Sequence, residues 1–260
     1  PVLLQTSVGG NYRGGIQMTN PSVDSNPDAK VHPMDEVTGR TIGIARQRVI
    51  GTDGMEEHIR IVNHGSQELR IPIVLGLGTD AADIFEVRGY PRLQRGRLLP
   101  VAVTDRRVTF RYDGLDGLQL LVHIACSDPA MSITPCVEGE PAPDGALDDL
   151  AAVHLRWDIH LDPDAERDLS WTIWSTIRQV DETGPDESTS RAELAAMFPP
   201  PPRVSTDEGA SAYHAWERGT TSVTCDHELL NLVVKRSVSD LRLLINEGPG
   251  PYQRYIAAGV

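Results

Sequence analysis

Residues 153–161, VHLRWDIHL, alternate apolar and polar side chains at every step. Because successive side chains of a β-strand point to opposite faces, this alternation predicts a strand with one buried and one solvated face. The same period of two recurs in residues 69–77, 118–126 and 169–173. Trp157 and Trp171 fall in the apolar phase of their runs, so we expect both in a hydrophobic core.

Runs of glycine, asparagine and aspartate separate the predicted strands. They are Asn63-His64-Gly65-Ser66, the pairs Asp113-Gly114 and Asp116-Gly117, and Asp162-Pro163-Asp164. These residue types adopt the backbone conformations that tight hairpins need. Consecutive antiparallel hairpins with one apolar face predict packed sheets. We therefore expect a mainly β fold, with a large antiparallel β-sandwich over residues 1–180.

The pattern changes after residue 180. Residues 181–224 hold a polar stretch, four prolines at 199–202 and two candidate short helices at 192–197 and 210–218, which together predict a proline-rich linker. Residues 226–246 have a helical period, with Asp226 as the expected N-cap. The apolar stripe of this helix consists of Leu229, Leu232, Val233, Val238, Leu241 and Ile245. We assign residues 225–260 to this C-terminal amphipathic helix and its lead-out, and expect another domain to cover the stripe.

Charge and cysteine content exclude several classes of protein. The formal net charge of −13 repels nucleic acid and anionic membrane, so neither is an expected partner. Three cysteines, Cys126, Cys136 and Cys225, do not form a disulfide framework in a chain of 260 residues. Cys126 and Cys136 could pair, but we interpret all three as small buried thiols in a reducing compartment. With no signal peptide and no apolar run near roughly 20 residues, we expect a cytoplasmic protein.

Several blocks, in the correct order along the chain, resemble one family. They are residues 48–51 (RVIG), 57–63 (EHIRIVN), 80–89 (DAADIFEVRG) and 108–117 (VTFRYDGLDG), followed by 229–244 (LLNLVVKRSVSDLRLL) and 252–260 (YQRYIAAGV). The first four are similar to the N-terminal domain of bacterial-type glycogen-debranching enzymes, which are amylo-α-1,6-glucosidase-like glycoside hydrolases. The last two resemble the helix and lead-in that open the catalytic barrel of that family. The resemblance runs from residue 48 onward and is weaker before residue 40 and in residues 181–209.

This resemblance implies a large, supersandwich-like β-domain that precedes a helical catalytic barrel. The barrel would carry the two carboxyl groups that cleave α-1,6-linked glucose, which inverting enzymes hold about 6.5–9.5 Å apart. The resemblance places those residues beyond Val260 and the opening strands of the domain before Pro1. We therefore expect no catalytic residue and no cofactor in this chain. The implied partners are the catalytic barrel and, through the full-length enzyme, an α-glucan or oligosaccharide.

The candidate site residues lie mainly in the segment 80–89. Asp80, Asp83 and Glu86 are spaced by three, which does not bring their carboxylates together as a metal or acid–base site requires. We interpret them as residues that orient a loop toward the junction with the barrel. Phe85, Glu86 and Arg88 offer an aromatic face and charged groups that could meet carbohydrate or the barrel rim.

Trp174 and Tyr255 are two further candidates for contact with substrate or barrel. Trp174 has the opposite phase to Trp171, so it faces away from the predicted core. Residues 154, 158 and 160 place two histidines and an aspartate on one strand face, but too far apart to bind a metal together. Residues 9–15 (GGNYRGG) lack the Lys-Ser/Thr ending of a phosphate loop and predict a turn. We expect no metal site.

Two other functions stay open on the sequence alone. The sandwich could act as a stand-alone α-glucan-binding protein. A small independent enzyme is the third alternative, although the sequence shows no nucleophile elbow, no H-E-x-x-H pattern and no C-x-x-C pattern to support it.

Overall fold

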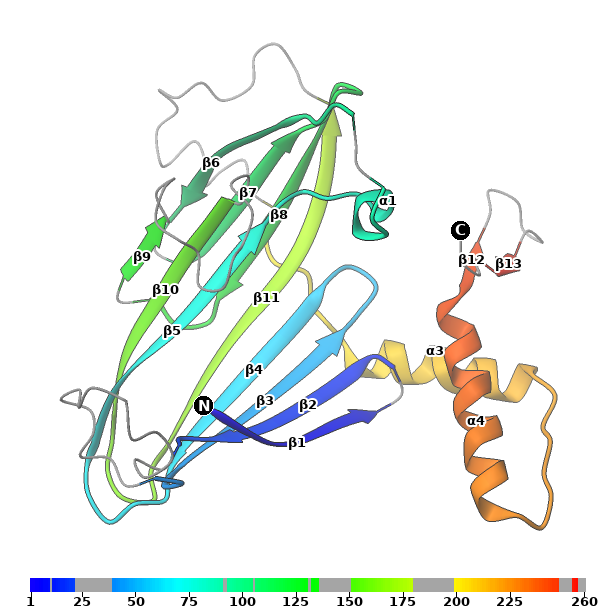
Figure 1. Cartoon of the computed structure of the whole chain (residues 1–260), viewed down its shortest axis with the longest axis horizontal. Coiled ribbons are helices and arrows are strands. Elements are labelled where there is room, and N and C mark those ends of the chain that lie inside the picture. Colours follow the sequence, from blue (N-terminus) through cyan, green and yellow to red (C-terminus); the bar gives the residue numbers. More distant parts are fainter. Residues whose placement is uncertain are drawn as a thin grey trace.

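The computed structural model describes residues 1–9, 11–21, 39–90, 93–104, 106–130, 132–135, 151–179, 199–247 and 254–256. Two β-sheets of unequal size face each other, and two helices stand at one side (Figure 1). The mainly β fold expected from the alternating runs is confirmed.

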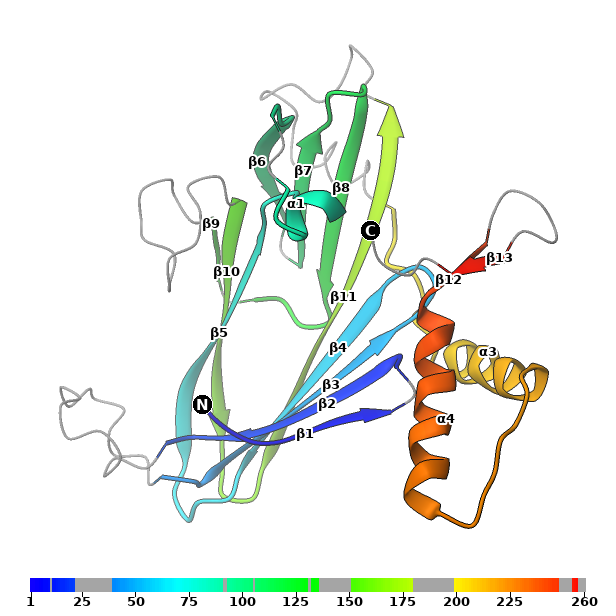
Figure 2. The same ribbon diagram turned by 45° about the vertical axis from the view of Figure 1, so that its right-hand side comes forward.

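The large sheet has eight antiparallel strands. In spatial order they are β1 (Val2–Gly9), β2 (Arg13–Thr19), β3 (Ile42–Ile50), β4 (Met55–Asn63), β11 (Glu166–Gln179), β8 (Leu118–Cys126), β7 (Arg107–Asp113) and β6 (Arg97–Val103). The small sheet has three, in the order β5 (Leu69–Thr79), β10 (Ala151–Leu161) and β9 (Ser132–Pro135). Strands β1 to β3 extend beyond the small sheet (Figures 1 and 2).

Two of the predicted hairpins are wrong, because their turns pass from one sheet to the other. β4 pairs with β11 and not with β5, and β10 pairs with β5 and not with β11. The turns at 63–66 and 162–164 are therefore sandwich corners. The turn at 113–117 does join neighbours, since β7 pairs with β8.

Asn63 ties the two corners together. Its Nδ2 donates to the carbonyl oxygens of Gln67 at 2.8 Å, Leu161 at 3.2 Å and Asp162 at 3.1 Å. Its Oδ1 accepts from the Gly65 amide at 3.0 Å, and its own carbonyl accepts from the Asp164 amide at 2.8 Å. Buried backbone groups need such partners where a chain leaves its sheet.

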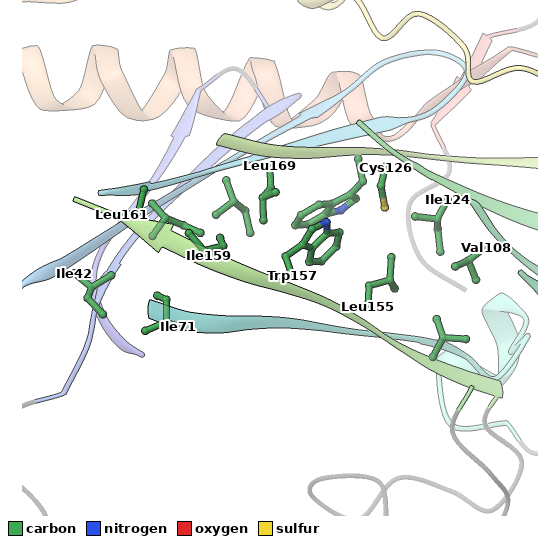
Figure 3. Packing of buried hydrophobic residues seen from close by; sticks show 14 of the residues in the cluster. Ile42, Ile71, Val108, Ile124, Cys126, Leu155, Trp157, Ile159, Leu161 and Leu169 are labelled. Carbon is green, nitrogen blue, oxygen red and sulfur yellow. The ribbon is translucent and has the colours of Figure 1, made fainter. Parts of the chain in front are cut away.

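The core lies between the sheets and is built from the apolar phases read in the sequence. Alternate residues of β10 interlock with inward-facing residues of β4, β7, β8 and β11 (Figure 3). Trp157 and Trp171 stack at the centre, with ring centroids 6.5 Å apart, as expected. Each fully buried aliphatic side chain of this core contributes about 1.5–3 kcal/mol to the free energy of folding. Cys126 is a free thiol in this core, whereas Cys225 is exposed, so the expectation of a buried thiol is wrong for Cys225.

Two helices follow the sandwich. α3 (Thr206–Gly219) begins earlier than the expected helix at 210–218, because the Ser205 side chain caps it and accepts from the Asp207 amide. α4 (Glu228–Leu243) is capped by His227 and not by Asp226, since His227 Nδ1 accepts from the Leu230 amide at 3.2 Å. β12 (Ile245–Glu247) and β13 (Arg254–Ile256) form a small hairpin after α4.

The expected helix at 192–197 lies outside the described residues. β11 ends at Gln179, but the division into domains at residues 180 and 224 stays a prediction. Of the helices in the described ranges, none has the length and apolar character needed to cross a membrane.

Candidate functional site

A four-residue helix, α1 (Ile84–Val87), interrupts the long connection between β5 and β6. Asp83 caps it, with its Oδ1 accepting from the amides of Phe85 and Glu86, each at 2.8 Å. Glu86 completes a capping box, because its Oε2 accepts from the Asp83 amide at 3.0 Å. The two carboxylates predicted to face a partner are therefore used to build the helix itself.

Arg95 binds this helix to the loop on either side. Its Nε lies 3.1 Å from Glu86 Oε1, and its Nη2 donates to the carbonyl of Asp80. The Asp80 carboxylate accepts from the Ala82 amide at 3.0 Å, and Ala81 adopts a positive φ of 50°. All three acidic residues thus stabilise the loop, while its orientation toward a catalytic domain stays a prediction.

The outer side of this loop is apolar and exposed. Val87 is 77% exposed and Leu93 is fully exposed, while Phe85 and Tyr90 each show more than half of their surface. Arg88 is also exposed, and its guanidinium has no partner in the part of the chain that the structure describes. We call Phe85, Val87, Arg88, Tyr90 and Leu93 the α1 tip. The sequence reading found Phe85 and Arg88 but missed the other three, although their apolar character inside a polar loop was a visible signal.

Trp174 lies on the outer face of the large sheet, as its phase indicated, but it is only 5% exposed. Its ring packs on the imidazole of His123, with centroids 5.1 Å apart. Gly54 lies between Trp174 and Pro202, since a Cβ on Gly54 would meet Trp174 Cβ at 3.2 Å and Pro202 Cγ at 3.3 Å. Trp174 is therefore too buried to serve as a stacking platform for sugar. The alternation of a strand predicts on which face a side chain lies, but it does not predict whether other residues cover that face.

His123 is a buried, neutral residue beneath Trp174. Its Nδ1 lies 3.0 Å from Thr109 Oγ1 and its Nε2 lies 2.9 Å from Thr176 Oγ1. Burial, and to a smaller extent the charges of Arg107 and Arg178, together lower the pKa of His123 to about 4. This histidine joins three neighbouring strands and has no access to a ligand.

Tyr255 lies in β13, where its backbone pairs with Asn246. Its side chain is outside the described residues.

Two charged clusters were missed by the sequence reading. Glu57 is buried on the inner face of the large sheet, where Arg46 Nε donates to it at 2.7 Å and Arg48 Nη2 at 3.1 Å. On the surface, His160 Nε2 lies 2.7 Å from Glu68 Oε1, and Asp162 lies close to both. Arg70 also pairs with Glu68 and would oppose a cation there. The sequence signal for the first cluster was a glutamate in phase with Ile59 and Ile61.

α4 presents an exposed apolar face. No described residue of this helix is buried. Its exposed apolar side chains are Leu229, Leu230, Leu232, Val233, Leu241 and Leu243, and the C-cap residue Leu244 is exposed beside them. Val238 and Ile245, which the sequence placed in the same stripe, are half-buried. Val238 turns toward α3, since its carbonyl accepts from Trp216 Nε1 at 2.9 Å.

The turn between β1 and β2 fixes the back of the helical pair to the sandwich. Asn11, at a positive φ of 54°, donates to Asp240 Oδ1 at 2.8 Å and to the Ser239 carbonyl at 3.2 Å. The rings of Tyr12 and Tyr213 lie 5.4 Å apart. Asn11 and Tyr12, from the glycine-rich stretch read in the sequence, therefore attach α4 and α3 to the sandwich.

The family model for the N-terminal domain of (some) glycogen debranching enzymes matches residues 1–172. The chain belongs to this family. The match starts at residue 1, earlier than the resemblance read from the sequence, and leaves α3 and α4 outside it. The similarity of residues 229–244 and 252–260 to the opening of a catalytic barrel thus stays a prediction.

Solved structures resemble the debranching-enzyme N-terminal domain only distantly. A chain described as a kojibiose phosphorylase from the human microbiome has 11% identity and a TM-score of 0.41, over 90% of this chain and 24% of that one. A galactose mutarotase-like protein from Lactobacillus casei has 9% identity and a TM-score of 0.37, over 66% of this chain and 72% of that one. A family GH92 α-mannosidase from Bacteroides thetaiotaomicron has 11% identity and a TM-score of 0.33, over 87% and 30%.

The chain spans about a quarter of the length of the first of these structures. Among curated proteins, none matches the sequence significantly. The family assignment therefore comes from the sequence model alone.

Proposed function

We propose that this domain is a non-catalytic module that braces the helical catalytic domain of a glycogen-debranching-type glycoside hydrolase of the α-1,6-glucosidase class. The enzyme as a whole would act on a branched α-glucan. The observation that carries the proposal is the exposed apolar face of α4. The family assignment suggests that a catalytic domain covers this face.

The exposed face of α4 needs a partner of matching chemistry. Burying a leucine or valine side chain contributes about 1.5–3 kcal/mol, and α4 shows six of them to solvent. Contiguous apolar surface of this kind is typical of an interface and not of a free surface. The back of α4 is occupied by α3 and by Asn11, so the free face points away from the sandwich.

A finer part of the proposal concerns α1. With Phe85 and Arg88 exposed on a tightly held turn, α1 would meet the rim of the catalytic domain and help to shape its substrate entrance. We also propose that the enzyme works in the cytoplasm, because Cys126 and Cys225 are both free, as thiols are in a reducing compartment.

The proposal is tested by the size and the activity of the native polypeptide. An antibody against this chain should detect a band far larger than 28.4 kDa in cells that make the protein. That larger polypeptide should release glucose from a branched dextrin, and the 260-residue chain alone should release none. A native band at 28.4 kDa, together with retardation of the chain in a glycogen-containing gel, would instead indicate a stand-alone glucan-binding protein.

A further inference from the structure

The α1 tip combines a hydrogen-bonded base with an exposed apolar surface. The base is held by the capping box of Asp83 and Glu86 and by the two contacts of Arg95. Above it, Val87 and Leu93 show almost all of their surface to solvent. Exposed loops of soluble domains are usually polar, and the ordering of a loop costs conformational entropy. A loop that is both ordered and apolar indicates a surface prepared for contact.

The composition of the tip favours protein over carbohydrate. Phe85 and Tyr90 could stack on a sugar ring, but the aliphatic Val87 and Leu93 offer neither a stacking face nor a hydrogen bond. Aromatic and apolar side chains with a single arginine are typical of the centre of a protein interface. Arg88 adds a cation on a chain whose net charge is −13. Its complement is a carboxylate on the partner, because a buried guanidinium needs a charged or hydrogen-bonded neighbour.

We propose that the α1 tip docks into an apolar socket of the catalytic domain, and that an acidic side chain in the wall of this socket receives Arg88. This inference rests on the proposed function, which it extends from α4 to a second contact. The tip is a binding element for protein, and the glucan does not touch it.

The placement of α1 supports a single partner for both surfaces. In Figure 1, α1 and α4 both lie to the right of the sandwich; in Figure 2, α1 lies in front of the sandwich and α4 stays at its right. In both views the β3–β4 hairpin lies between them. One domain resting on α4 can therefore reach α1 across this hairpin.

The first experiment is hydroxyl-radical footprinting of the native-length polypeptide and of the 260-residue chain. In the native-length protein, oxidation of Phe85 and Tyr90 should be slower by about threefold or more, since an interface core excludes water. Leu115, exposed in the turn between β7 and β8, is the internal reference and should oxidise at the same rate in both. Equal rates at Phe85 and Tyr90 in the two polypeptides would overturn the inference.

The failure of this inference is distinguishable from failure of the proposed function. If Leu230 and Leu232 of α4 are protected while the tip is not, the catalytic domain docks without α1 and only the inference fails. If neither surface is protected, both fail. If Phe85 and Tyr90 were protected from oxidation only when glycogen is added, the glucan and not the catalytic domain would bind the α1 tip, and the inference would be wrong.

Substitutions at Arg88 test the acidic wall of the socket. In the native-length protein, Arg88→Glu should raise the oxidation of Phe85 toward the rate in the 260-residue chain, whereas Arg88→Lys should leave the protection in place. Leu115→Ser serves as the matched exposed control and should change nothing at Phe85. Protection of Phe85 that survives Arg88→Glu would show that no carboxylate receives this arginine.

Discussion

Asn63 shows how much of a sandwich can depend on one amide side chain. It is buried where β4 and β10 both leave their sheets, and its Nδ2 is shared among three carbonyl oxygens. A buried carbonyl that loses its donor pays the full cost of desolvation, about 1–3 kcal/mol. The residue therefore stabilises both corners of the sandwich at once.

Replacing this amide should weaken the whole domain. Asn63→Ala removes the donors to Leu161 and Asp162 and should lower the free energy of unfolding by about 2–4 kcal/mol. Urea denaturation measures the change. Gln67→Ala is the control, since only the backbone carbonyl of Gln67 takes part in the corner. A loss no larger than that of the control would mean that solvent satisfies these carbonyls.

His123 makes the stability of the domain depend on pH. Its pKa is about 4 in the folded protein, against the ordinary value of 6.5 in the unfolded chain. Between these values the unfolded state binds the proton and the folded state does not, so stability should fall as the pH drops from 6.5 to 4. The loss from this residue should reach at most about 3 kcal/mol below pH 4.

The measurement is the melting temperature across this pH range for the wild type and for His123→Gln. Glutamine is neutral at every pH and keeps a donor and an acceptor for Thr109 and Thr176. The variant should therefore show a flatter dependence between pH 6.5 and 4. Equal slopes in the two proteins would assign the pH dependence to other groups.

At the scale of elements, the sequence predicted which residues form strands but not which strands pair. The run 118–126 coincides with β8, and 153–161 lies within β10, because alternation encodes the two faces of a strand. Alternation does not encode which strand lies next to which in a sheet, so the turns at 63–66 and 162–164 were predicted to be hairpins. The same limit applies to Trp174: its sheet face was predicted correctly, but the residues that bury it on that face could not be predicted. α1 itself was signalled by Asp83 and Glu86 at capping-box spacing.

The capping box of α1 should be a local and not a global source of stability. Asp83→Ala removes the acceptor for the Phe85 and Glu86 amides, and loss of a cap of about 1 kcal/mol corresponds to about fivefold faster local opening. Hydrogen exchange at these two amides measures it. Asp83→Asn keeps an acceptor at the N-cap and should retain most of the protection. Unchanged exchange in Asp83→Ala would show that Arg95 alone holds the turn.

At the scale of the whole molecule, the sandwich and the helical pair meet through a narrow contact. Asn11 and Tyr12 of the sandwich contact α4 and α3, Trp216 joins α3 to α4, and the front of α4 stays open. A helix with an apolar face is stabilised mainly by burying that face. The isolated chain therefore carries a surface that its own fold does not satisfy.

This surface should bind a hydrophobic dye and promote self-association of the 260-residue chain. Substituting both Leu232 and Val233 by serine should reduce dye fluorescence several-fold, because these side chains lie in the exposed stripe. The melting temperature should hardly change, since neither side chain is buried. Leu115→Ser, which removes an isolated exposed leucine, should have little effect on dye binding. If the double variant bound as much dye as the wild type, α4 would not be the apolar surface that a catalytic domain covers, and the bracing role would lose its physical basis.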